Sequence, residues 1–96
     1  MGSDIEDGCL KMKRIIRIKS VHKYVGVGVY DYQPTSVAVR LLTLTCKNFD
    51  IKCDVLKVDE ESAKLCFRGN KETIREIINA FNIDKGHLFN IDVCLF

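Results

Sequence analysis

The sequence predicts an α+β domain in which an antiparallel sheet carries two helices on one face. Short segments that alternate apolar and polar residues surround two longer segments with apolar side chains at helical spacing. The segments follow one another in the order β-β-α-β-β-α-β, which favours one sheet covered by helices. A chain of 96 residues suits one compact core, so we assign residues 13–96 to a single domain and residues 1–12 to a flexible arm.

The first two strands are expected at residues 13–19 and 25–30. In the first segment three isoleucines lie among lysines and arginines, which predicts a partly exposed strand. In the second segment three valines alternate with two glycines and a tyrosine, which leaves one face of the strand bare for another backbone or a packed helix. Gly26-Val27-Gly28 lacks the third glycine of the dinucleotide-binding fingerprint, so we expect no cofactor there.

Residues 34–48 are predicted to form the first helix. Pro34 suits the first helical turn, where its missing N–H leaves no hydrogen bond unmade, and the helix is expected to end near Lys47. The expected buried stripe consists of Val37, Leu41 and Leu44 with the adjacent Ala38, Leu42 and Thr45.

Residues 51–56 and 63–68 alternate apolar and polar side chains and are predicted to pair as a hairpin. The turn between them is polar and lacks the glycine that two-residue turns favour, which predicts a wider loop. Its residues are Asp59, Glu60, Glu61 and Ser62.

Asn70 is a suitable N-cap for a second helix, and Glu72 lies early enough to complement the helix dipole. Residues 89–95 alternate apolar and polar side chains again and are expected to form the last strand. The predicted buried stripe of the second helix consists of Ile74, Ile77, Ile78 and Phe81.

The formal net charge is +2, from 15 Lys and Arg against 13 Asp and Glu, which gives no strong attraction to nucleic acid. Residues 11–23 are locally basic, but no aromatic side chain that could stack on bases is interleaved before Tyr24. We interpret this segment as a solvated strand face rather than an RNA-binding platform, and expect no nucleic-acid partner. No stretch is apolar enough for a membrane helix, so no membrane partner is expected either.

No catalytic residues are predicted. His22 and His87 lie in connections without a recognisable Ser or Cys nucleophile motif, so we do not expect an enzyme. The five cysteines show neither CxxC spacing nor a histidine at metal-ligand spacing, so no metal site is predicted from spacing. Their odd number argues against a complete disulfide framework and fits a reducing cytoplasm.

Residues 25–79 resemble the bacterial microcompartment shell domain. The resemblance rests on Val27-Gly28-Val29-Tyr30 with the helix start Gln33-Pro34-Thr35, on Lys57-Val58-Asp59-Glu60-Glu61-Ser62, and on Arg68-Gly69-Asn70-Lys71-Glu72-Thr73-Ile74. The flanking segments are similar to circularly permuted shell proteins of ethanolamine, propanediol and glycyl-radical compartments; they are Arg14-Ile15-Ile16, and Gly86-His87-Leu88-Phe89-Asn90 with Cys94.

The resemblance implies a ferredoxin-like, permuted shell domain that forms flat homohexamers, which tile with other shell proteins around encapsulated enzymes in the cytoplasm. It places the acidic turn around the six-fold axis as a metabolite pore lined by Lys57, Asp59, Glu60, Glu61 and Ser62. Six like-charged loops cannot all point inward ionised, so we expect some of these acids to pair with Lys57 or Lys64. Lys47 resembles the family's lysine at the hexamer edge, although a lysine that complements a helix dipole has the same pattern.

Some shell proteins of this family hold an iron–sulfur cluster at the pore, which requires thiolate ligands. The candidate ligands here are Cys66 and Cys53, the nearest cysteines after and before the acidic turn. Acids in place of the family's glycine-rich pore loop mark a divergent member. The alternative is a small ferredoxin-like regulatory or adaptor module that dimerises through a sheet edge and binds a ligand or a partner protein.

Overall fold

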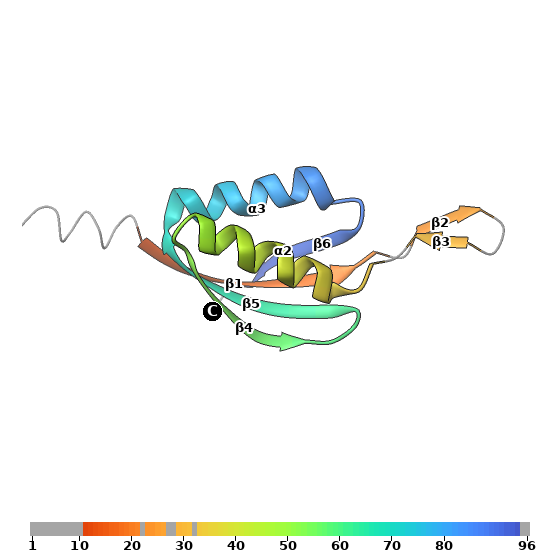
Figure 1. Cartoon of the computed structure of the whole chain (residues 1–96), viewed down its shortest axis with the longest axis horizontal. Coiled ribbons are helices and arrows are strands. Elements are labelled where there is room, and N and C mark those ends of the chain that lie inside the picture. The colour runs from red at the N-terminus through yellow and green to blue at the C-terminus, as the bar shows by residue number, and fades with distance from the viewer. Residues whose placement is uncertain (1–10, 22, 27–28, 32, 95–96) are drawn as a thin grey trace, which may run out of the picture.

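The computed structural model describes residues 11–21, 23–26, 29–31 and 33–94. Figure 1 shows the elements in their order along the chain. They are β1 (Lys11–Ser20), β2 (Lys23–Gly26), β3 (Val29–Asp31), α2 (Thr35–Asn48), β4 (Lys52–Val58), β5 (Ser62–Asn70), α3 (Lys71–Lys85) and β6 (Phe89–Cys94). β1 thus begins two residues before the expected start near Lys13.

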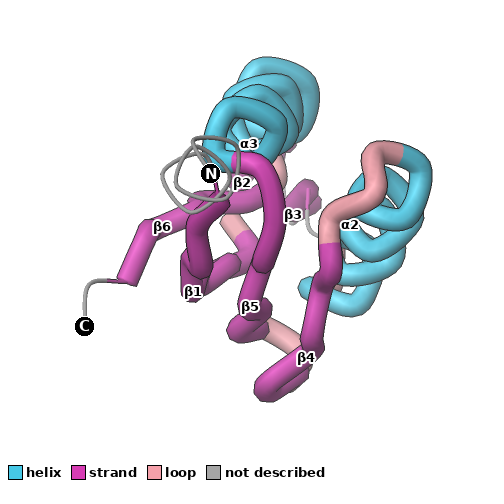
Figure 2. Tube along the Cα trace, turned by 90° about the vertical axis from the view of Figure 1, so that its left-hand side faces the viewer, coloured by secondary structure: helices cyan, strands magenta, loops and turns pink. Residues whose placement is uncertain are grey.

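Four strands form one sheet in the order β4-β5-β1-β6, and every neighbouring pair is antiparallel. Both helices lie on the same face of this sheet, and no helix among the described residues covers the opposite face (Figures 1 and 2). Apart from β2 and β3, the order is β-α-β-β-α-β, which is compatible with a ferredoxin-like fold. The predicted α+β class, the antiparallel sheet and the two helices on one face are confirmed.

The core lies between the sheet and the two helices. In the central strands, Ile16 pairs with Leu65 and both side chains are fully buried, as is Phe67 two residues further along β5. Ile74 of α3 and Leu42 of α2 close the core from above. Each such side chain contributes about 1.5–3 kcal/mol by leaving water, so this layer is the main source of stability.

The structure corrects the buried stripe predicted for α2. Val37, Leu41 and Leu44 are 37%, 36% and 55% exposed. Ala38 and Leu42 of the predicted stripe are buried as expected, and the helix also buries Thr35 and Cys46. This helix has two adjacent apolar stripes. The stripe with the smaller side chains faces the sheet, because small side chains allow the helix to approach β4 and β5 closely.

The segment 25–30 was expected to be one strand of the sheet, and this prediction is wrong. The chain forms a separate two-stranded ribbon in which β2 pairs with β3, and Gly26 is the register partner of Val29. Gly26 is the last described residue of β2, and glycine within a strand weakens it. Val27 and Gly28 lie outside the described residues. Figure 1 shows the ribbon beyond the end of the main sheet.

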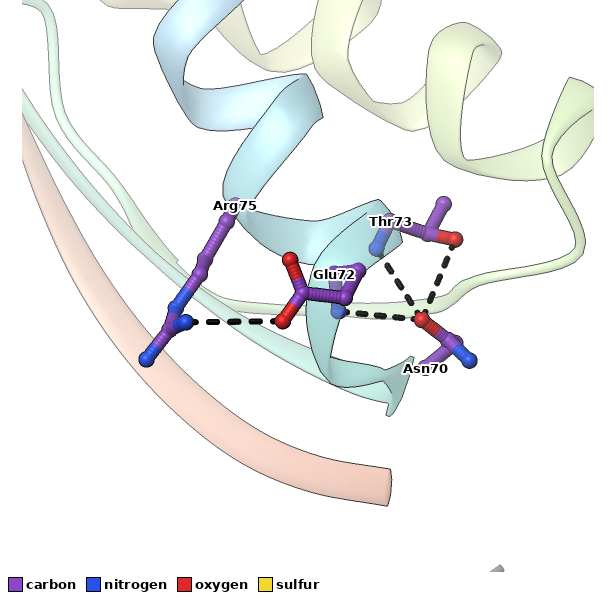
Figure 3. Close-up of polar contacts among 4 residues, drawn as sticks. All are labelled: Asn70, Glu72, Thr73 and Arg75. Atoms are coloured by element: carbon purple, nitrogen blue, oxygen red, sulfur yellow. Dashed lines mark hydrogen bonds and ion pairs between the residues drawn. The ribbon is translucent and has the colours of Figure 1, made fainter. Parts of the chain in front are cut away.

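The start of α3 agrees with the sequence prediction. The Asn70 Oδ1 atom accepts hydrogen bonds from the backbone N–H groups of Glu72 at 2.9 Å and Thr73 at 3.1 Å (Figure 3). Arg75 lies 3.5 Å from the Glu72 carboxylate. All four residues of the predicted stripe, from Ile74 to Phe81, are buried. The N-cap thus fixes where β5 ends and the helix begins.

Gly69 lies immediately before this cap, with a φ of +154°. A Cβ atom at this position would lie 2.6 Å from the Ile51 Cδ1 atom. The close packing of Ile51 over the end of β5, together with the backbone angle, therefore requires glycine here.

Replacing Asn70 by alanine should destabilise the fold. Loss of the side-chain cap costs about 1 kcal/mol. For a domain of this size that lowers Tm by roughly 4–8 °C. Thermal and urea unfolding followed by circular dichroism measure the change. Asn70→Ser is the control because serine also caps helices, and equal stability of the alanine and serine variants would contradict the assignment.

Candidate functional site

The predicted pore residues lie at the β4–β5 turn, at the end of the sheet where β1 also ends. Val58 ends β4 and Ser62 begins β5, so residues 59–61 lie between the strands. The Asp59 N–H donates to the Ser62 carbonyl oxygen at 2.7 Å, which leaves Glu60 and Glu61 between this hydrogen-bonded pair, a tighter turn than predicted. The Lys57 Nζ atom lies 3.3 Å from the Asp59 Oδ2 atom, which confirms the expected pairing of a turn acid with Lys57. Both side chains are more than half exposed, so this pair contributes little to stability.

The backbone of this acidic turn, residues 59–61, is held by the start of α2. The buried Thr35 hydroxyl donates a hydrogen bond to the Asp59 carbonyl oxygen, and the Thr35 N–H donates to the Glu60 carbonyl oxygen at 2.9 Å. The Ser20 N–H at the end of β1 donates to the Glu61 carbonyl oxygen at 2.9 Å. Three hydrogen bonds from two elements, α2 and β1, therefore fix the turn, and the sequence did not identify Thr35 as the residue that anchors it.

Lys47 lies in the last turn of α2, at the opposite end of this helix from the acidic turn. It lines a hollow of about 420 Å³ together with Asp50, Lys52 and Arg68. Three cations and one carboxylate thus surround a concave site at the β4 edge of the sheet. This grouping joins Lys47, predicted as a hexamer-edge residue, to two basic strand residues that were not predicted as site residues.

The two candidate iron–sulfur ligands lie on opposite faces of the sheet. Cys53 pairs with Phe67 in the β4–β5 register and packs against the core, whereas Cys66 pairs with Asp54 and belongs to the helix-free face. Cys66 is only 2% exposed. Within the described residues, no three His, Cys, Asp or Glu side chains come together in a way that could hold a metal ion.

Cys53 and Cys46 interact with each other. A hydrogen bond from the Cys46 thiol lowers the pKa of Cys53, against the opposing effects of burial and of the nearby Asp54 carboxylate. The same hydrogen bond, together with burial, raises the pKa of Cys46 far above its usual range. The two thiols therefore form a small pair between α2 and β4, and Cys46 is the one that keeps its proton.

The helix-free face of the sheet is strongly basic. Strand alternation places the core residues on the helix side and their sequence neighbours on the other side. The register partners on the helix-free face form rows across the strands, and two of these rows consist of cations. The first cationic row is Lys52, Arg68 and Lys13, and the second cationic row is Lys57, Lys64 and Arg17.

Several carboxylates lie near these two rows. Asp54 lies on β4 of the same face, between Lys52 and Lys57. Asp92 is the register partner of Arg17 on β6, and Asp59 pairs with Lys57 beyond the end of β4. Lys13 also has an interaction partner. Among the residues that the structure describes, Arg68 and Lys64 have no carboxylate within ion-pair distance, so the uncompensated positive charge is that of these two residues.

A third row lies between the two cationic rows and is mostly apolar. It consists of Asp54, Cys66, Ile15 and Cys94. Ile15 and Cys94 are half-buried and Cys66 is buried. The helix-free face thus has a cationic row, an apolar row and a second cationic row, which suits an elongated anionic partner.

The basic character of residues 11–23 is apparent from the sequence and predicts a solvated strand face. The cations of β4 and β5 give a second signal, because basic residues occupy the polar positions of the alternating pattern there. Counting which positions of the predicted hairpin face away from the helices would have found Lys52, Lys64 and Arg68. Placing them beside Lys13 and Arg17 required the β1–β5 register.

Comparison with protein-family models, with curated proteins and with solved structures gives no match for this chain. Among the helices of the described residues, none combines the length and the apolar character needed to cross a membrane.

Replacing Thr35 by valine should loosen the acidic turn. The change removes the hydroxyl and leaves the part-buried Asp59 carbonyl oxygen without that donor, which costs about 1 kcal/mol. Cleavage by a glutamate-specific protease in the native state measures opening of the turn at Glu60 and Glu61. Asn70→Ala is the matched control because it destabilises the other end of the sheet. Equal cleavage of the two variants at equal global stability would contradict a local anchoring role.

Proposed function

We propose that the chain is a non-catalytic binding module of ferredoxin-like fold whose helix-free sheet face binds a polyanion. The observation that supports this proposal is the pair of cationic rows across β4, β5 and β1. It corresponds to the small ferredoxin-like regulatory or adaptor module that the sequence left open as an alternative, and it adds the helix-free sheet face as the binding surface.

Cross-strand rows of like charge are unfavourable without a partner. Side chains directly opposite one another have Cβ atoms only about 4.5–5.5 Å apart, and like charges in this position destabilise a sheet. Arg68 has a cation on each side, because it is the register partner of both Lys52 and Lys13. An anionic group above Arg68 would attract all three cations and offset their mutual repulsion. The helix-free face should therefore bind polyanions favourably.

The hollow at the β4 edge extends the first cationic row. Lys52 and Arg68 belong to both the row and the lining of the hollow, and Lys47 adds a third cation from α2. A sulfate or phosphate group seated there would meet donors from a strand edge and a helix end. We therefore place the strongest anion contact at this edge and the rest of the path across β5 and β1.

Charge reversal at the centre of the face should weaken polyanion binding. Arg68→Glu removes the middle cation of the first cationic row and repels the ligand, so we expect affinity for heparin to fall about tenfold at low salt. Isothermal titration at two salt concentrations measures the effect. Arg40→Glu, an identical change at an exposed position of α2, is the control. Equal affinities of these two variants would overturn the proposal.

The second candidate function is the divergent, permuted microcompartment shell tile. The observation that favours it is the anchored acidic turn, because a pore needs a loop with a fixed backbone. In a hexamer this turn would lie around the axis, with Lys57 and Ser62 beside it and Lys47 at the tile edge. An iron–sulfur variant would need Cys53 or Cys66 to reach the axis, and both lie in strands outside the turn.

Native mass spectrometry separates the two candidates. A shell tile should give a species of six copies, which Lys47→Ala should prevent from growing into sheets. A binding module should give one or two copies. A hexamer that fails to bind heparin would reject the binding module, and a monomer or dimer would reject the tile.

A further inference from the structure

We propose that the polyanion is single-stranded nucleic acid, bound in an extended form with its phosphates on the two cationic rows and its bases against Ile15 in the row between them. This inference rests on the proposed polyanion-binding function and adds the class of partner. It reverses the interpretation of residues 11–23 as a solvated face, because the structure joins this segment to cations of β4 and β5.

The spacing of the rows suits a chain of phosphates and bases. Successive residues on one face of a strand are about 6.6–6.8 Å apart, so the apolar row lies about 7 Å from each cationic row, and the cationic rows lie about 13 Å apart. Neighbouring strands are about 4.8 Å apart, so three cations in a row span roughly 10 Å. This area is large enough for several nucleotides of an extended strand and is bordered by cations on two sides.

The apolar row favours a single strand over a duplex. Base faces are exposed in a single strand and stacked inside a duplex, so Ile15 can contact a base only when the strand is unpaired. A sheet of four strands is also roughly 19 Å wide, which exceeds the major groove of about 12 Å. A purely sulfated or phosphorylated polymer would gain nothing from the half-buried Ile15 between the rows.

The described residues of the helix-free face include no aromatic side chain at the central positions, which are Ile15 on β1 and Cys66 on β5. Stacking therefore contributes little, and most of the affinity comes from phosphate contacts. The binding should consequently be tolerant of sequence and strongly dependent on salt. The nucleic acid should contact β4, β5 and β1 but not β6, because β6 presents the Asp92 carboxylate on this face.

Fluorescence anisotropy with a labelled oligo(dT) tests the inference. A length of about 12 nucleotides is suitable, because it lies within the range of known single-strand binding sites. With six cations on the rows and a contribution of about 0.7 per phosphate contact, the plot of log affinity against log salt should have a slope of about −2 to −4. Arg68→Glu should weaken binding about tenfold, and Arg40→Glu should leave it nearly unchanged.

A gain-of-function variant tests the apolar row. Ile15→Tyr places a stacking ring between the cationic rows, and should raise the affinity for oligo(dT) about fivefold or more while leaving heparin binding unchanged. Ile15→Leu is the control for a change of shape without an aromatic ring. Circular dichroism confirms that both variants are folded.

Competition with unlabelled ligands distinguishes the possible classes of partner. Unlabelled oligo(dT) should displace the probe better, per charge, than a DNA duplex, heparin or vesicles that contain phosphatidylserine. If duplex or heparin competes equally well and Ile15→Tyr has no effect, the inference is wrong while the polyanion-binding function stands. Preferential binding to the vesicles would assign the face to a membrane surface and also overturn the inference. If none of the four binds, the proposed function fails as well.

Discussion

The antiparallel pairing of β1 with β5 is the constraint on which the rest of the structure depends. Its register brings Ile16 opposite Leu65 on the helix side and Lys13 opposite Arg68 on the other side. Because side chains alternate with period two, a slip of one residue would move the isoleucines into water and the cations into the core. The hydrophobic core therefore enforces the positions of the basic residues, and the same register that stabilises the fold builds the cationic rows.

The elements that the sequence predicted well have one dominant local signal. α3 has a polar cap at Asn70 and a continuous apolar stripe, and the β4–β5 hairpin has clean alternation on both sides of a charged turn. α2 has two adjacent apolar stripes, and hydrophobicity alone selects Leu41 and Leu44 over the smaller residues that pack on the sheet. The valines and glycines at 25–30 fit a strand, but pairing partners are decided by tertiary contacts that periodicity does not contain.

The candidate site was harder to predict because its residues are close only in the folded sheet. Lys13 and Arg68 are far apart in sequence and become register partners, as do Arg17 and Lys64. The overall charge of +2 hides this asymmetry, since acids on the helices and in the acidic turn offset the basic face. Net charge is a property of composition, whereas a binding face is a property of strand register, so the first cannot exclude the second.

The two ends of the sheet differ in charge. At one end, Thr35 holds the backbone of an acidic turn, and Lys57 is drawn toward Asp59. At the other end, Lys52 and Arg68 lie beside a hollow that Lys47 also lines. A polyanion on the sheet face is therefore repelled at the turn and attracted at the hollow. This gradient would make the phosphate contacts on the first cationic row stronger than those on the second, so the acidic turn influences binding on this face without lining a pore.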